Sequence, residues 1–247
     1  MIYITGDTHR DFTKLNSRSI RRLESMTKDD YVIICGDFGG VWSADKDDDY
    51  WLDWLESKSF TTLFVDGNHE NFDKLYSYPV KEWNGGRVHV IREHVLHLKR
   101  GYVFDICGKK IFTFGGAASH DISDGVLETS DPDFKKKKRW LDRIGGMYRI
   151  KNVSWWPQEM PSEGEYYNAL SNLNVANWNV DYVISHCAPT GVQKVINDAF
   201  GGDELTDFLD KISKDLEFKC WFCGHYHKDI DIGQNYMVLY RDVVRIV

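Results

Sequence analysis

The chain has 247 residues, of which 42% are hydrophobic and 28% charged, and its net charge at pH 7 is −7. These proportions are ordinary for a globular protein and argue against a disordered chain, a collagen-like repeat and a coiled coil. No stretch approaches the roughly 18 uninterrupted apolar residues of a membrane span, and the first segment turns polar too soon for a signal peptide. We therefore expect a single domain over residues 1–247, cytoplasmic and without a membrane partner.

The five cysteines are Cys35, Cys107, Cys187, Cys220 and Cys223, and they lie scattered through hydrophobic stretches. An odd number without regular spacing argues against a disulfide framework, so we expect reduced thiols. The last two form a CxxC pattern, but no second pair accompanies it to complete a zinc site.

Three short apolar runs in the first part of the chain each end in polar residues. Residues 1–5 precede Gly6-Asp7, residues 31–35 precede Gly36-Asp37, and residues 61–65 precede the segment Asp66-Gly67-Asn68-His69. The intervening stretches 13–26 and 47–58 have the apolar spacing or the acidic start of helices. Alternating strands and helices predict a sheet with parallel strands, and such sheets bind ligands beyond the carboxyl ends of their strands.

The pattern changes after residue 87. Short alternating runs at 88–91, 95–98, 102–106 and 111–114 predict a β meander, consistent with a second sheet. Residues 116–165 are polar and irregular, so we expect a long insertion that caps the sheet end. Helical patterns over 166–178 and 204–216 alternate with two strands, 182–185 before His186 and 220–223 before Gly224-His225-Tyr226-His227.

Side chains that can bind metals or act in catalysis therefore collect at five strand ends: Asp7, His9, Asp37, Asn68, His69, His186, His225 and His227. Carboxylate, imidazole and amide donors make a mixed nitrogen and oxygen site, which suits Mn²⁺, Fe or Zn²⁺ better than Mg²⁺ or Ca²⁺. The donors are numerous enough for two ions, and a carboxylate can bridge two cations. Two such ions can clamp a phosphoryl group and activate a water molecule.

Each of these residues, taken alone, also has a purely structural explanation. Asp7 is also a candidate helix cap, Asn68 suits a turn, and a single His186 is typical of a core histidine with a satisfied hydrogen bond. The order of the elements favours function, because every one follows a strand and all would project to the same end of the sheet.

The ordered motifs are Asp7-Thr8-His9, Gly36-Asp37, Gly67-Asn68-His69-Glu70, His186 and Gly224-His225-Tyr226-His227. In this order they resemble the motifs of the calcineurin-like metallophosphoesterases. The resemblance implies an α/β fold, namely a four-layer αββα sandwich of two mixed β-sheets flanked by helices, with a binuclear metal centre at the carboxyl ends of the strands. The segments 115–121 and 154–159 are similar to those of a bacterial and phage subset of the family.

By this resemblance, one metal is held by Asp7, His9, Asp37 and His227, and the other by Asp37, Asn68, His186 and His225. Asp37 then bridges the two divalent ions, which we expect to be Mn²⁺, with Fe or Zn²⁺ as alternatives. The implied reaction is hydrolysis of a phosphate mono- or diester by in-line attack of a hydroxide that bridges the metals. His69 is the implied catalytic histidine, which donates a proton to the leaving oxygen.

The motifs say less about the substrate. In the protein phosphatases of this family an arginine follows the second motif, and the segment Gly36-Asp37-Phe38-Gly39-Gly40 lacks it, which puts a phosphoprotein substrate in doubt. Arg10 and His120 are candidate substrate contacts. Trp155 and Trp156 form either a stacking wall for an aromatic group or a packing anchor for the insertion, and packing is favoured.

Two alternative functions stay open. The basic run Lys135-Lys136-Lys137-Lys138-Arg139 would attract nucleic acid in a phosphodiesterase or nuclease, although such a run is more often a solvated helix face. Cyclic nucleotides are the other diester substrates of this kind. The second alternative is a non-catalytic metal-binding scaffold, and the complete ligand set together with His69 argues against it.

Overall fold

The computed structural model describes residues 1–16, 21–43 and 46–247 and contains two large mixed sheets. The first sheet is built from β1 (Ile2–Thr5), β2 (Tyr31–Ile34), β3 (Thr61–Phe64), β4 (Val80–Trp83), β5 (Gly86–Arg92), β6 (Val95–Leu98) and β15 (Val243–Arg245), in the order β15-β1-β2-β3-β6-β5-β4. The second sheet is built from β7 (Tyr102–Ile106), β8 (Lys109–Phe114), β11 (Tyr182–Ser185), β12 (Cys220–Cys223), β13 (Ile230–Ile232) and β14 (Tyr236–Val238), in the order β13-β14-β12-β11-β8-β7.

The helices are α1 (Lys46–Glu56), α2 (Phe72–Leu75), α3 (Phe134–Ile144), α4 (Glu163–Val175), α5 (Thr190–Ile196) and α6 (Glu204–Ser213). Short 3₁₀ turns occupy Thr13–Leu15, Arg21–Ser25 and Pro157–Glu159. Two helix starts are fixed by capping boxes, because Ser162 and Asp203 each exchange hydrogen bonds with the third residue of the following helix.

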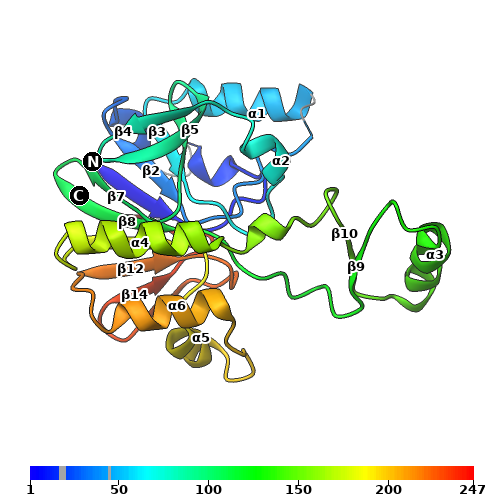
Figure 1. Cartoon of the computed structure of the whole chain (residues 1–247). Coiled ribbons are helices and arrows are strands. Elements are labelled where there is room, and N and C mark those ends of the chain that lie inside the picture. The colour runs from blue at the N-terminus through cyan, green and yellow to red at the C-terminus, as the bar shows by residue number, and fades with distance from the viewer. Residues whose placement is uncertain (17–20, 44–45) are drawn as a thin grey trace.

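The body has four layers, and an apolar cluster fills each of the three spaces between neighbouring layers (Figure 1). Alternate residues of β1, Ile2 and Ile4, face the second sheet and pack with Phe104 and Ile184 between the two sheets. The residue between them, Tyr3, belongs to the cluster that joins the outer face of the first sheet to α1 and α2. A third cluster joins the outer face of the second sheet to α4 and α6. The alternation of side chains along each strand therefore produces the expected αββα sandwich.

Two expectations drawn from the sequence need correction. The stretch 13–26 forms 3₁₀ turns at Thr13–Leu15 and Arg21–Ser25 in place of a regular helix, and its residues 17–20 lie outside the described part of the chain. The four runs between 88 and 114 do not build one meander, because β5 and β6 join the first sheet and β7 and β8 join the second. The polypeptide crosses between the sheets at the turn that contains Gly101, whose φ is +78°.

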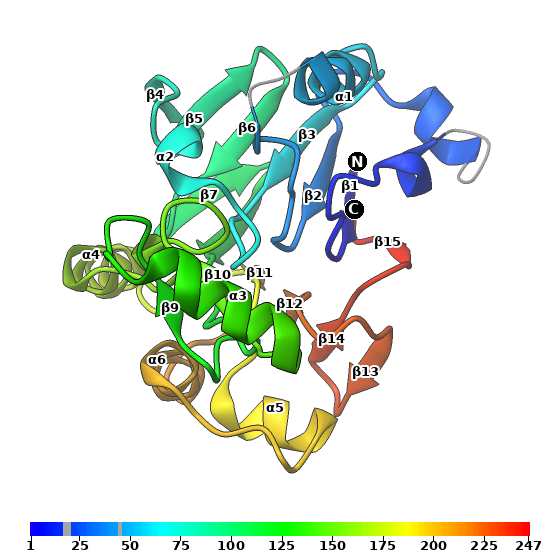
Figure 2. The same cartoon turned by 90° about the vertical axis from the view of Figure 1, so that its right-hand side faces the viewer.

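Residues 116–162, called the arm below, extend away from the side of the body (Figure 1). The arm contains α3 and the short parallel ladder of β9 (Val126–Leu127) and β10 (Arg149–Ile150), so it is more ordered than the irregular insertion that its sequence suggests. Figure 2 looks onto this side of the molecule, with α3 in front of the body.

All five cysteines are free. Within the described ranges, none of the helices combines the length and the apolar character that crossing a bilayer demands.

Candidate metal centre

The candidate residues meet at the junction of the two sheets. Asp7 follows β1 and Asp37 follows β2, and these parallel strands pair in register. His186 follows β11 and His225 follows β12, which are parallel neighbours in the other sheet. Because the carboxyl ends of parallel strands lie at one edge, stacking the sheets brings both sets of side chains together.

The backbone at this junction adopts unusual conformations. His9, Asp37, His225 and His227 have φ values of 43°, 44°, 69° and 50°, and Gly36 has a φ of 92°. Positive φ is strained for residues other than glycine, and such strain tends to gather at functional sites, where the surrounding structure enforces it. The turns therefore aim these side chains inward at some energetic cost.

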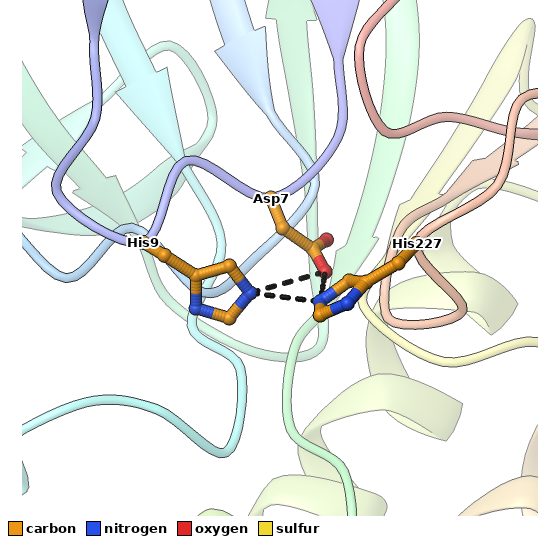
Figure 3. A group of neighbouring side chains, drawn as sticks. All are labelled: Asp7, His9 and His227. Carbon is orange, nitrogen blue, oxygen red and sulfur yellow. Dashed lines mark hydrogen bonds and ion pairs between the residues drawn. The ribbon is translucent and has the colours of Figure 1, made fainter.

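Asp7, His9 and His227 form the first group of donors (Figure 3). The Nε2 atoms of the two histidines lie 2.8 Å apart. An Oδ2 oxygen of Asp7 lies 3.2 Å from His227 Nε2 and 3.7 Å from His9 Nε2. Three atoms with lone pairs thus converge on one small region, as the ligand atoms around a metal ion do.

Asp7, Asp37 and His186 form the second group, with Asn68 beside it. His186 Nε2 lies 3.4 Å from Asp37 Oδ1 and 3.3 Å from Asn68 Oδ1. The other ring nitrogen, Nδ1, lies 2.8 Å from the carbonyl oxygen of Cys35. This contact orients the ring and leaves Nε2 as the atom that faces the group, an arrangement common around metal-binding histidines.

Asp37 connects the two groups. Its Oδ1 faces His186, while its Oδ2 lies 3.7 Å from His9 Nε2. Asp7 also touches both groups, but its oxygens accept hydrogen bonds from the backbone N–H of His225 at 2.9 and 3.1 Å. One carboxylate thus offers an oxygen to each side, which is the geometry a bridging ligand needs.

The electrostatics of the second group indicate a site for positive charge. Burial alone would raise the pKa of Asp37, but His186 beside it outweighs burial and holds that pKa well below its usual range. Burial would likewise lower the pKa of His186, and the two carboxylates Asp37 and Asp7 raise it to about 10. A proton on His186 therefore balances buried carboxylates in the same place where a cation would.

The chain leaves room for the donors by placing glycines beside them. A Cβ atom at Gly67 would lie 2.1 Å from Asp37 Oδ1, and one at Gly224 would lie 2.0 Å from Asp7 Oδ1. Donor chemistry, convergence and this absence of obstructing side chains together fit a metal ion in each group.

A third cluster, Glu56, Glu93 and His94, has a simpler explanation. His94 Nδ1 lies 2.6 Å from Glu56 Oε1, and the His94 backbone N–H donates to the same carboxylate at 2.8 Å. The cluster is held by these contacts between His94 and Glu56 and lies away from the sheet junction.

His69 stands beside the donors. Its backbone N–H donates to Asp37 Oδ1 at 2.8 Å, which fixes the loop to the Asp37 carboxylate. Burial lowers the pKa of the His69 ring, and the charge of Asp37 opposes this shift only in part. The ring borders a cavity of about 250 Å³ that Asn68, His120, Asp121, Arg149 and His225 also line.

Four buried or half-buried residues near the site were not anticipated from the sequence. Glu70 accepts backbone hydrogen bonds from Phe38 and Gly39, so it holds the turn after Asp37. Ser119 and Glu159 hydrogen-bond to each other at 2.7 Å from opposite ends of the arm. The fourth, Arg149, reaches His69 from β10. The only sequence signal for Ser119 and Glu159 was the similarity of segments 115–121 and 154–159 to a subset of the family, and Arg149 lies outside both segments.

Asp66, just before the third motif, has a structural role. It is fully buried and pairs with the guanidinium of Arg100, while His97 Nε2 lies 3.0 Å from its other oxygen. Arg100 Nη2 also donates to the carbonyl oxygen of Gln158 at 2.8 Å. This buried network fixes the strand end that carries Asn68 and His69, and it ties the base of the arm to the sheet.

The four candidate substrate contacts occupy different places. His120 lies in the cavity, with its Nε2 3.0 Å from His225 Nε2. Arg10 pairs with Asp48 at 2.9 Å and borders a separate hollow of about 200 Å³ with His9 and His69.

The two tryptophans do not line the metal-centre cavity. Trp156 is only 2% exposed, packs edge-on against Trp42 and donates from Nε1 to Asp73 at 2.8 Å. Trp155 donates from Nε1 to Glu159 at 2.7 Å. For Trp156 this overturns the stacking alternative, because a ring in the core cannot meet a substrate, and packing is the role that the structure supports.

Fold and site together define a class: a four-layer α/β sandwich with candidate metal ligands at the carboxyl ends of its strands. The sequence profile of the calcineurin-like phosphoesterase family matches residues 1–229, and the chain belongs to this family. Membership indicates an enzyme that hydrolyses phosphoesters with the help of metal ions. A search of curated proteins finds no significant match.

Proposed function

We propose that this protein hydrolyses a phosphate mono- or diester at a centre of two divalent metal ions, with Mn²⁺ as the preferred ion and Fe or Zn²⁺ as alternatives. The observation that carries the proposal is the convergence of donors from both sheets around Asp37, which offers one oxygen to each group. One ion would be held by Asp7, His9, Asp37 and His227, and the other by Asp37, Asn68, His186 and His225. Mixed nitrogen and oxygen donors support these metals.

When bound, the two ions would lower the pKa of a water molecule and neutralise charge on the phosphoryl oxygens. The chain itself supplies the geometry. The N–H of His69 and the ring of His186 both contact Asp37 Oδ1, which restrains the orientation of the carboxylate. Preorganisation of this kind avoids reorganisation during the reaction.

His69 is the proposed general acid. Burial keeps its ring neutral in the free protein, because its pKa is lowered. An anionic phosphoryl group in the adjoining cavity would favour the protonated ring, since an opposite charge nearby raises the pKa of a histidine. The ring would then donate a proton to the leaving oxygen.

The arm supports a second candidate function, cleavage of a nucleic-acid diester. Lys135 and Lys136 are exposed on α3, and Trp140 on the same helix is 55% exposed. Exposed cations next to an aromatic ring suit a single-stranded polyanion. Two of the neighbouring lysines, Lys137 and Lys138, are already paired with Asp131 and Asp142, which weakens the attraction. We therefore rank nucleic acid below a small phosphoester.

The test compares Mn²⁺-dependent hydrolysis of p-nitrophenyl phosphate and bis-p-nitrophenyl phosphate. The variant Asp37→Asn is expected to lose metal and activity together, and Asp105→Asn, an exposed aspartate on β7, serves as the matched control. Preference for the diester would direct the search to nucleic acids and cyclic nucleotides. A protein that holds two metals and cleaves neither ester, nor any of a broad panel, would favour the scaffold alternative.

A further inference from the structure

Arg149 is a cation from the arm that lies against the metal centre. It belongs to β10, yet only 7% of the residue is exposed, because its side chain turns back toward the body. It lines the same cavity as His69 and Asn68. A buried guanidinium needs hydrogen-bond or charge partners in place of water. The partners of each Arg149 nitrogen therefore show which of them is still able to bind a ligand.

The guanidinium is anchored on two of its three nitrogens. Its Nε lies 2.7 Å from Asp121 Oδ1, and its Nη1 donates to the carbonyl oxygen of Ser154 at 3.1 Å. The third nitrogen, Nη2, lies 3.1 Å from His69 Nε2. Nη2 also lies 3.5 Å from His69 Nδ1. Because Nη2 carries two hydrogens and a neutral imidazole has one acceptor nitrogen, one of these hydrogens has no protein acceptor among the contacts of the described residues.

The Arg149 guanidinium and the His69 ring lie side by side at the wall of this cavity. The nearby carboxylate, Asp121, contacts Nε, and 53% of its side chain is exposed. An anion seated in the cavity beside both groups would accept one hydrogen bond from Nη2 and one from the imidazole. A phosphoryl group has oxygens that can take both hydrogen bonds, and arginine is well suited to phosphate.

We propose that Arg149 is a substrate-binding residue that donates from Nη2 to a non-bridging oxygen of the phosphoryl group, and that Asp121 is the positioning residue that aims it. This inference rests on the proposed function, because it places the phosphoryl group in the cavity beside His69. It makes the arm part of the active site: β10 supplies a cation that the sheets do not provide.

The first test is calorimetric binding of inorganic phosphate to the Mn²⁺-loaded protein, with metal content measured in parallel. Arg149→Ala is expected to bind phosphate about ten- to a hundred-fold more weakly, the loss typical of a hydrogen bond to a charged group, with unchanged metal content. The matched control is Lys151→Ala, because Lys151 lies just after β10 but pairs with Glu128 at the surface. Wild-type phosphate affinity in Arg149→Ala would overturn the proposal.

The variant Asp121→Asn tests the positioning role, because the two explanations predict opposite changes in phosphate affinity. If Asp121 only added negative charge to the cavity, its removal would strengthen phosphate binding. If it positions Arg149, its removal weakens binding several-fold in the wild type and has little effect in Arg149→Ala, because coupled residues are not additive. Tighter binding in Asp121→Asn would contradict the assigned role.

Two further results decide the cases in which the first variant does not fold or the protein hydrolyses no ester. If Arg149→Ala does not fold, Arg149→Lys decides, since it keeps the charge but loses the planar fork. About ten-fold weaker phosphate binding is expected for it, and wild-type affinity would overturn the proposal. If the wild type binds phosphate through Arg149 but hydrolyses no ester, the proposed function fails while the phosphate site stands.

Discussion

Asp37 and His186 face each other across 3.4 Å although they follow strands of two different sheets. The contact exists only when the sheets are stacked, and the interior that stacks them is a continuous apolar cluster of Ile2, Ile33, Ile184 and their neighbours. The site is therefore a product of tertiary packing, because neither sheet carries a complete set of donors. Packing defects between the sheets should weaken metal binding even when no ligand is changed.

The variant His69→Ala should retain metal and lose turnover. The ring belongs to neither donor group, whereas its backbone N–H, which the variant keeps, holds Asp37. Loss of a general acid lowers kcat by about 10²- to 10⁴-fold. The check is kcat for a substrate with a poor leaving group at matched metal content. Turnover equal to that of the wild type would remove His69 from the mechanism.

Substitution Gly67→Ala should empty the centre without touching a ligand. The added Cβ would lie 2.1 Å from Asp37 Oδ1 and 2.7 Å from His186 Nε2, so the carboxylate or the ring must shift. We expect metal content to fall sharply while the far-ultraviolet circular dichroism stays native. Gly201→Ala is the control, because a Cβ there meets nothing within 4 Å. Full metal occupancy in Gly67→Ala would contradict this close packing of Gly67 against the donors.

Metal binding should release a proton near neutral pH. In the metal-free protein the pKa of His186 is raised to about 10 by Asp37 and Asp7, which outweigh burial. The ring therefore holds its proton at pH 8, and a metal must displace it, so affinity should increase as the pH rises toward 10. Titration calorimetry of Mn²⁺ in buffers with different ionisation enthalpies measures the release. Binding without proton release at pH 8 would contradict the assignment.

The raised pKa of His186 also makes the stability of the metal-free protein depend on pH. Because the pKa of His186 is raised on folding, its protonated form stabilises the native state fully below its ordinary pKa of about 6.5. That contribution declines as the pH rises through about 10. Metal-free protein should accordingly become easier to unfold in urea between pH 7 and pH 10.

Trp156→Ala should act on stability and leave substrate affinity alone. The ring is 2% exposed and packs in the cluster beneath α1 and α2, so its loss should lower the free energy of unfolding by about 3–5 kcal/mol. Trp140→Ala, at an exposed position on α3, should change it by less than about 0.5 kcal/mol. Urea unfolding and KM measured together make the distinction. A raised KM with native stability would restore the stacking role.

Most strands could be predicted from local sequence, and so could the polar side chains that follow them, whose role as metal ligands stays a prediction. The strands at 182–185 and 220–223 match β11 and β12, because each is a short apolar run bounded by polar residues. The assignment of β5 and β6 to one sheet and β7 and β8 to the other could not be predicted, since it depends on contacts between distant segments. The role of Arg149 was hidden for a similar reason. Its sequence neighbourhood is a polar insertion, and only the folded arm brings it to His69.

The most direct test of a two-metal centre is a titration of chelator-treated protein with Mn²⁺, in which hydrolysis and bound metal are measured on the same samples. We expect the metal-free protein to be inactive, and hydrolysis of p-nitrophenyl phosphate or its diester to rise to a plateau at two ions per chain. Asp37→Asn should reach neither the plateau nor full occupancy, because Asp37 contacts both donor groups. Undiminished hydrolysis without metal, or a plateau at one ion, would contradict a two-metal centre built around Asp37.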